Sequence, residues 1–272
     1  MSLTVAAGLL SCPICQADLD AGDRQFTCPA RHTFDVARQG YVNLLNGPQP
    51  AHADTAAMLT ARQRFLATGA YDELATQVAA AVGCGLDSGG VALEAGAGTG
   101  FYIARCLDAV EGAVGIASDI SVAAARVAAR AHDRLASVVA DTWRRLPLRD
   151  QSADLVLVVF APRNAGEFVR VLRPGGALVV VTPQADHLAG LREPYQLMAV
   201  DPDKDERLID SLGDRFVLDS ARPISYEADL SAEQVADLIA MGPNAFHGPP
   251  VSVRSARILV SCVARTFRLA GS

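Results

Sequence analysis

The chain has 272 residues, of which 50% are hydrophobic and 20% charged, and its net charge is −6. Half of the residues can enter a core, which excludes a wholly disordered chain, and the length suits one large domain or a domain with a small appendage. Every apolar run is far shorter than the roughly 20 residues of a membrane-spanning helix. We therefore expect a globular protein with no membrane partner.

The acidic net charge argues against a broad basic surface of the kind that nucleic-acid-binding proteins usually present. Residues 1–70 are balanced, with five arginines and five acidic residues, so the rest of the chain carries the whole net charge. Three of the six cysteines fall within residues 12–28, and the first residues lack the basic start of a secretion signal, so we expect a reducing cytoplasm. The remaining cysteines are expected in the core: Cys84, Cys106 and Cys262.

Residues 1–45 are rich in cysteine, proline and turn residues without a helical period, which predicts a small metal-held module. Cys12, Cys15, Cys28 and His32 follow the spacing C-x2-C-x12-C-x3-H. Two tight pairs at this spacing can reach one ion, and three sulfurs with one imidazole complete the tetrahedral shell of a structural zinc site. We expect zinc to hold the module folded, in preference to buried thiols or a local disulfide.

The following segment, residues 46–83, is interpreted as a helical linker of two helices with a break at Gly69. Residues 84–272 then alternate short apolar strands with helical stretches, a pattern typical of an α/β domain with a parallel sheet covered by helices on both faces. Residues 173–176 are expected to form a Pro-Gly-Gly turn. Strands are expected at 91–95, 113–119, 136–141, 153–160, 177–182, 216–221 and 256–267, and helices at 99–110, 121–132, 164–172 and 231–241.

A glycine-rich loop joins the first of these strands to a helix. Gly96, Gly98 and Gly100 let the backbone turn sharply and approach a ligand, while the start of the helix offers free N–H groups. Asp119 ends the next strand, where a carboxylate can grip a ribose diol.

Two further carboxylates favour S-adenosylmethionine over a dinucleotide. Glu94 stands at the edge of the loop, where it would repel a pyrophosphate but attract a sulfonium ligand with an ammonium group. Asp141 ends the third strand, where it can meet an adenine edge. After the fourth strand, the loop Phe160-Ala161-Pro162-Arg163-Asn164 is expected to face the methyl acceptor, with Asn164 also a helix N-cap.

The zinc spacing, the segment FDVARQGYVNLL at 34–45 and the loop EAGAGTG at 94–100 together resemble the bacterial 23S ribosomal RNA (guanine-N1)-methyltransferase family. The likeness covers nearly the whole chain, and the FAPRN and MGPNAFH segments resemble the branch that includes the tylosin-resistance enzymes. It implies a class I, Rossmann-like fold with an N-terminal zinc-ribbon-like module, and methyl transfer to N1 of a guanine in hairpin 35, near the macrolide site. It also implies methyl-donor contacts at Tyr71, Thr99, Gly100 and His187, and the family loop usually opens with Asp where this chain has Glu94.

Guanine N1 carries a proton at neutral pH, so the enzyme must extrude the base and provide a proton acceptor. Asp141, Asn164 and His247 are the candidates, and loss of the proton to water is an alternative. Phe246 can stack the flipped guanine or anchor its loop on the core, and His247 lies beside it. The zinc module is expected to recognise the RNA, or to present a solvated charged face, through Arg24, Arg31 and Arg38.

Two other functions fit the same sequence. One is a methyltransferase of a small molecule, which the acidic charge permits and the zinc module argues against. The other is a catalytically inactive protein that binds S-adenosylmethionine and assists ribosome assembly. The sequence leaves open a homodimer, which would widen an RNA cleft, and whether the methyl group serves antibiotic resistance or ribosome maturation.

Overall fold

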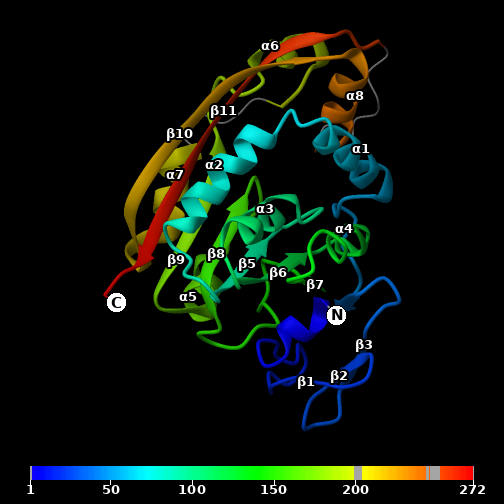
Figure 1. Cartoon of the computed structure of the whole chain (residues 1–272), viewed down its shortest axis with the longest axis vertical. Helices are drawn as coiled ribbons and strands as arrows, with labels where there is room; N and C mark the ends of the chain where they lie inside the picture. Colours follow the sequence, from blue (N-terminus) through cyan, green and yellow to red (C-terminus); the bar gives the residue numbers. More distant parts are fainter. Residues whose placement is uncertain (1, 199–203, 243–244, 246–251, 272) are drawn as a thin grey trace.

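The computed structural model describes residues 2–198, 204–242, 245 and 252–271. Its centre is a mixed eight-stranded sheet (Figure 1). From one edge to the other the strands are β10 (Phe216–Leu230), β11 (Ala256–Leu269), β9 (Leu172–Pro183), β8 (Ala153–Val159), β5 (Val91–Ala95), β6 (Val114–Asp119), β7 (Leu135–Val139) and β4 (Tyr41–Asn43).

Strand direction divides this sheet into two parts. Neighbouring strands from β4 to β9 are parallel, as the alternation of strands and helices predicts. β11 runs antiparallel to β9 and to β10, so the long hairpin of β10 and β11 extends the sheet at one edge. The ends of the parallel strands carry the loops that the sequence singles out.

Side chains alternate between the two faces of the buried strands. On β8, Leu155 and Leu157 enter one core, and Val156 and Val158 enter the other. The first core packs against α1 (Ala56–Ala67), α2 (Asp72–Gly83), α3 (Phe101–Ala109), α6 (Ala189–Tyr195) and α8 (Ala232–Ala240). The second packs against the turn η1 (Ser2–Ala6), α5 (Ala165–Val171) and α7 (Lys204–Leu212), which is followed by η2 (Gly213–Arg215).

The N-terminal module packs on the second core. Its own sheet consists of β1 (Asp20–Ala21), β2 (Gln25–Thr27) and β3 (Thr33–Asp35). The module continues into β4, which pairs in parallel with β7 and closes the edge of the main sheet. Figure 1 shows the module in blue at one end of the molecule, beside α4 (Val122–Ala128) and β7.

Several expected elements are confirmed. The segment around Gly69 forms α1 and α2, and Thr55 caps α1 by accepting a hydrogen bond from the Met58 N–H. The expected turn at 173–176 is instead part of β9. Leu172 pairs with Ala153 on β8, and the next pair is Ala177 with Leu155, so residues 173–176 lie at a register shift between the two strands. The polar residues 204–212, for which the sequence predicted no helix or strand, form α7.

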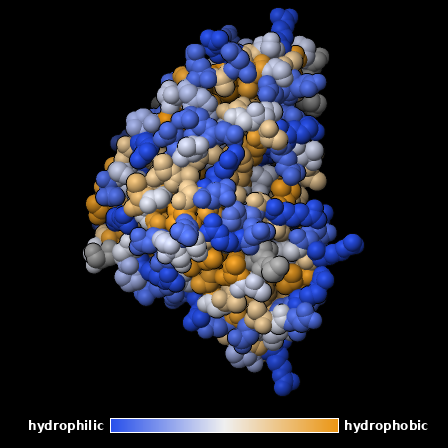
Figure 2. Space-filling model, viewed as in Figure 1, coloured by the Kyte–Doolittle hydropathy of each residue, from blue (hydrophilic) through white to orange (hydrophobic). Residues whose placement is uncertain are grey.

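The cysteines outside the zinc motif divide between core and surface. Cys106 and Cys262 are buried, as expected. Cys84 is exposed at the end of α2, where its thiol donates to the Ala80 carbonyl, so the expectation of a core position was wrong for this residue. No helix in the described ranges is long and apolar enough to cross a membrane. Hydrophilic and hydrophobic residues are interspersed on the face shown in Figure 2.

Candidate functional site

A cavity of about 530 Å³ opens where the carboxyl ends of the parallel strands meet α1 and α8. Its volume is in the range of small-molecule sites, and its position is the usual ligand crevice of open α/β sheets. Gly100 lies behind the glycine loop, where it caps α3, and is not among the residues that line the cavity. The other predicted donor-binding residues line it: Tyr71, Glu94, Gly96, Gly98, Thr99, Asp119, Asp141 and His187.

The glycine loop lies close to the acceptor loop on one side and to Arg62 of α1 on the other. Gly96 has φ of 73°, and a Cβ at this position would lie 2.4 Å from Cβ of Ala161 in the acceptor loop. Gly98 has φ of 54°, and its Cβ would lie 2.7 Å from Nη1 of Arg62. Positive φ favours glycine at both positions, and at Gly96 the neighbouring Ala161 also leaves no space for a side chain.

Glu94 is the most unusual charged residue of the cavity because it is only 1% exposed. Its Oε2 accepts a hydrogen bond from the Ile103 N–H at 3.2 Å, and its Oε1 has no partner among the described residues. Burial raises the pKa of this carboxyl well above its usual range, and the nearby Asp119 charge adds to the effect. A buried acceptor without a partner is costly, so the site fits a cationic ligand group that would pair with Oε1.

Asp119 and Asp141 are anchored by backbone N–H groups. Asp119 accepts from Gly98 through Oδ2 and from Ser121 through Oδ1, both at 2.8 Å, while burial raises its pKa. Asp141 accepts from the Trp143 N–H at 2.9 Å. Both carboxylates line the cavity with fixed orientations, as a ribose and an adenine edge would require.

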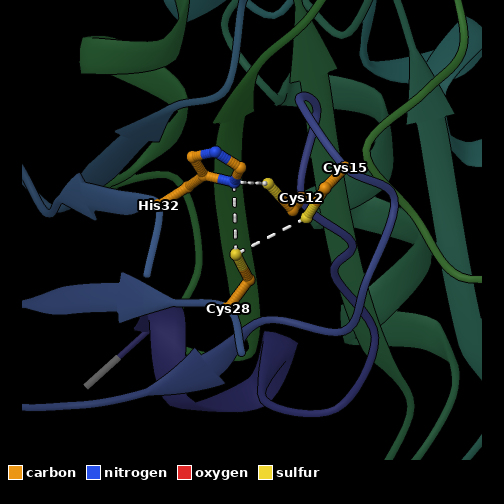
Figure 3. A group of neighbouring side chains, drawn as sticks. All are labelled: Cys12, Cys15, Cys28 and His32. Carbon is orange, nitrogen blue, oxygen red and sulfur yellow. Dashed lines mark hydrogen bonds between the residues drawn. The ribbon is translucent and has the colours of Figure 1, made fainter. Parts of the chain in front are cut away.

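The predicted metal ligands come together in the N-terminal module (Figure 3). Their four ligand atoms lie within 4.8 Å of one another. Nδ1 of His32 is 3.5 Å from Sγ of Cys12 and 3.4 Å from Sγ of Cys28, and the Sγ atoms of Cys15 and Cys28 are 3.6 Å apart. A tetrahedral zinc with Zn–S bonds of 2.3 Å separates its sulfurs by about 3.8 Å, so the cluster fits the ion.

Two similar turns build the cluster. Cys12 accepts from the Gln16 N–H through its carbonyl, and Cys28 accepts from the Arg31 N–H, each at 2.8 Å. Gln16 and Arg31 both adopt positive φ, at 66° and 65°. Burial raises the pKa of the Cys28 thiol, but hydrogen bonds from the His32 backbone and from Cys15 outweigh it and bring the pKa to about 7, which favours the thiolate that binds zinc.

Comparison with known proteins tests this combination of module and cavity. Residues 10–49 match the family described as RlmA, N-terminal, of the zinc-ribbon type, and residues 93–180 match the family described as Methyltransferase domain. A relative from Streptomyces fradiae, named 23S rRNA (guanine(748)-N(1))-methyltransferase, is 44% identical over 89% of this chain and 87% of its own length. The chain belongs to the 23S rRNA (guanine-N1)-methyltransferase family.

Other relatives agree with this family. A Micromonospora griseorubida protein, provisionally named a 23S rRNA (guanine-N(1)-)-methyltransferase, is 46% identical over 95% of this chain and 96% of its own. YxjB of Bacillus subtilis, with the same provisional name, is 32% identical over 92% of this chain and 91% of its own. The expected family is confirmed.

Solved structures show the fold. A chain from a complex between the Haloferax volcanii Trm112 methyltransferase activator and a provisionally assigned methyltransferase is 19% identical, with a TM-score of 0.53, covering 80% of this chain and 99% of that one. A chain from work on thioacetal formation in echinomycin biosynthesis is also 19% identical, with a TM-score of 0.51 and coverage of 72% and 82%. These structures confirm the expected methyltransferase fold, and the match to the methyltransferase-domain family confirms the expected S-adenosylmethionine dependence.

The methyltransferase holds the two family-derived residues, Tyr71 and His187, in buried positions on the cavity wall. Tyr71 packs edge-on against Phe65, with ring centroids 4.9 Å apart, and burial raises the pKa of its hydroxyl. Nδ1 of His187 accepts a hydrogen bond from the Ser261 N–H at 3.1 Å, so in the neutral ring Nε2 carries the proton. Neither residue could be found from its neighbours in the sequence. Contacts with other elements hold them on the cavity wall: β11 for His187 and α1 for Tyr71.

The acceptor loop lies at the mouth of the cavity. Phe160 has φ of 53° and is 41% exposed, and its ring lies 5.9 Å from the His187 ring. A non-glycine residue in this conformation carries backbone strain of a kind that clusters at functional sites. Pro162 lines the cavity, while Arg163 and Asn164 line an adjoining groove. Asn164 caps α5 by accepting from the Glu167 N–H, as predicted, and its amide donates to the Thr142 carbonyl.

Three cavity residues escaped the sequence analysis. Arg62 on α1 pairs with Asp54 at 2.7 Å and donates to the Met241 carbonyl, which ties α1 to the end of α8. Tyr102 faces the cavity from the first turn of α3. Trp143, the single tryptophan of the chain, is 64% exposed at the mouth. Of these three, only Trp143 could have been predicted from the sequence, because it follows the predicted cavity residue Asp141 by two positions.

The remaining candidates are on the surface or outside the described residues. Arg24, Arg31 and Arg38 are exposed on the zinc module, and none forms an ion pair with another described residue. Phe246 and His247 lie outside the described residues. The role of each predicted residue in binding remains a proposal.

Proposed function

We propose that this methyltransferase transfers a methyl group from S-adenosylmethionine to N1 of a guanine in hairpin 35 of 23S rRNA. The observation that carries the proposal is the 44% identity, over 89% of the chain, with the Streptomyces fradiae protein whose name specifies N1 of guanine 748. The cavity and the zinc cluster support it because they provide a donor site and an added module in one chain. This activity would also fit a role in antibiotic resistance.

We assign the donor-binding roles by the chemistry of the cavity wall. S-adenosylmethionine, when bound, supplies a methyl group activated by the sulfonium charge. Glu94 would pair with the ammonium group through Oε1, Asp119 would hold the ribose, and Asp141 would meet the adenine edge. Tyr71 and His187 would close the cavity around the donor, and the backbone of the loop residues that line the cavity would contact it: Gly96, Gly98 and Thr99.

The acceptor loop would receive the extruded guanine. Phe160 is partly exposed at the mouth of the cavity, where its ring would stack on a flat base. Of the three candidates for the proton acceptor, Asp141 is the one with a described carboxylate on the cavity wall, and this role would replace its contact with the adenine edge. The Asn164 amide is engaged as a helix cap, and His247 lies outside the described residues. A pH–rate profile unchanged by Asp141→Asn would assign the proton to water instead.

We further propose that the zinc module binds the RNA hairpin through its exposed arginines, and that residues 1–45, 46–83 and 84–272 act as RNA-binding, linking and methyl-transferring segments. A substrate of ribosomal RNA implies action in the cytoplasm. A homodimer would offer two zinc modules to one RNA. Light scattering of the zinc-loaded protein, measured with and without RNA, tests this. A monomer mass in both measurements would exclude the homodimer.

Labelled S-adenosylmethionine separates the candidate functions. The zinc-loaded protein is incubated with a hairpin 35 transcript and, separately, with a cell-extract metabolite pool. Label in the RNA supports the proposal. Label only in metabolites indicates a small-molecule methyltransferase, and donor binding without transfer to either indicates an inactive assembly protein.

A further inference from the structure

A second groove adjoins the donor cavity. It has a volume of about 580 Å³ and is formed by the acceptor loop, the start of α5, the end of α7 and η2. Trp143 and Pro162 line both hollows, so the groove begins at the mouth of the cavity. The elements α5 and α7 pack on the same core as the zinc module, which places the groove on the face that carries the proposed RNA-binding module.

Two arginines give the groove its charge. Arg163 is half-buried, and among the described residues its guanidinium has neither an ion pair nor a hydrogen bond. Burial lowers its pKa, and no neighbouring carboxylate acts on it. Arg215, on η2, also lines the groove and is exposed.

The acidic residues close in sequence to the two arginines do not pair with Arg163. Glu167, on the first turn of α5, is bound by Arg170 and accepts a hydrogen bond from the Leu146 N–H at 2.7 Å. Asp214 precedes Arg215 in the chain but is not among the residues that line the groove. A half-buried cation without a counter-charge indicates a site that an external anion completes.

Trp143 provides an aromatic surface at the junction. Its side chain is 64% exposed, although burying an indole ring is strongly favourable. Exposed aromatic rings beside guanidinium groups are the usual means by which proteins hold single-stranded nucleotides, through base stacking and phosphate contacts. The combination fits a nucleotide better than an isolated phosphate.

We propose that this groove binds the nucleotide next to the target guanine, with Arg163 and Arg215 on its phosphate and Trp143 stacked on its base. This inference rests on the proposed RNA substrate and adds a subsite to it. An extruded base must pull its neighbours toward the protein, and the groove receives one of them as the guanine enters the cavity.

The test couples a protein change to an RNA change. Hairpin 35 RNAs are made with a neutral methylphosphonate at the phosphate on either side of the target guanine, and their affinities are measured with zinc-loaded wild-type protein and Arg163→Gln. We expect the neutral phosphate on one side and Arg163→Gln each to weaken binding about 10-fold, and the combination to weaken it no further. Arg222→Gln removes the same charge from exposed β10, at the far edge of the sheet, and is the matched control.

The outcomes separate this inference from the proposed function. Two results would overturn the subsite while leaving the function intact, provided that the wild-type protein methylates the RNA. One is that the losses of affinity from Arg163→Gln and from the neutral phosphate multiply to about 100-fold, whichever side of the guanine carries it. The other is that Arg163→Gln binds the RNA as well as Arg222→Gln does. If the wild-type protein leaves the hairpin unmethylated, the proposed function itself fails. Arg215→Gln changes an exposed side chain and repeats the test if Arg163→Gln does not fold.

The single tryptophan gives a direct signal. With the donor cavity saturated by S-adenosylhomocysteine, addition of the hairpin should quench the fluorescence of Trp143, because stacked bases quench indole emission. Trp143→Ala should weaken RNA binding more than Trp143→Phe does, because phenylalanine keeps an aromatic ring that can stack. Unchanged fluorescence at RNA saturation would overturn the stacking assignment.

Discussion

The burial of Glu94 indicates that the cavity binds a cationic ligand. Its carboxylate is buried beside the glycine loop, one oxygen bonded to the Ile103 N–H and the other without a partner. Folding alone would select a hydrophobic or neutral side chain at this position, because the buried charge is costly. The cost is offset when a cation enters the cavity, so the residue is best explained by ligand binding.

Glu94→Gln should weaken S-adenosylmethionine binding about 10- to 100-fold, the loss expected for a charge-assisted hydrogen bond of about 1.5–3 kcal/mol. Calorimetric titration of the zinc-loaded protein measures this. Thr60→Ala on the exposed face of α1 is a control that keeps the cavity intact. Equal affinities of wild-type and Glu94→Gln would remove Glu94 from the donor site.

The raised pKa of Glu94 also predicts how stability depends on pH. The folded chain binds the Glu94 proton more tightly than the unfolded chain does, so this residue lowers the free energy of unfolding as pH rises above about 4.3. Without ligand, the melting temperature of wild-type should fall relative to that of Glu94→Gln between acidic and neutral pH. Saturating S-adenosylmethionine should reduce this difference, and parallel melting curves at all pH values would contradict the assignment.

At the scale of elements, two loops from different strands define the cavity by touching each other. The loop after β5 has no side chain at Gly96 because Ala161, after β8, occupies that space. The sequence shows each loop but not their contact, since the partner strands are brought together only by the order of the sheet. Both loops line the cavity, which is where a methyl donor and acceptor would meet.

Gly96→Ala should weaken S-adenosylmethionine binding at least about 10-fold, because its Cβ would lie 2.4 Å from Cβ of Ala161. The double variant with Ala161→Gly should recover part of this loss by removing the clashing atom, while the positive φ of residue 96 still opposes alanine. Donor affinity of both variants is the measurement. No recovery in the double variant would show that the loop contact does not control the cavity.

The two turns that carry the zinc ligands could be predicted from the sequence alone, because the spacing of the motif places two ligands on each turn. Cys28→Ser should lower the bound zinc from one ion per chain to a small fraction, measured by elemental analysis, because one of four ligands is lost. Affinity for the hairpin should fall with the zinc. Cys84→Ser, at an exposed cysteine away from the cluster, should keep the full zinc content. Full zinc occupancy in Cys28→Ser would contradict the assigned ligands.

At the scale of the whole molecule, the module and the sheet are joined by β4, which pairs with β7, and by the bridge between Leu10 and Leu148. Sequence reasoning predicted the parallel strands and the glycine loop because their patterns are short and local. It did not predict that β4 closes the sheet, nor that α7 forms a wall of the second groove. Those features depend on contacts between distant segments, which no local pattern of residues encodes.

Primer extension across hairpin 35 detects the proposed product, because N1-methylguanine cannot pair and stops the polymerase. RNA is compared from the parent strain, a strain lacking the gene, and that strain carrying the wild-type gene or Glu94→Gln. We expect a stop at one guanine that disappears on deletion, returns with the wild-type gene and returns weakly or not at all with Glu94→Gln. A stop that persists unchanged in the deletion strain would contradict the proposed function.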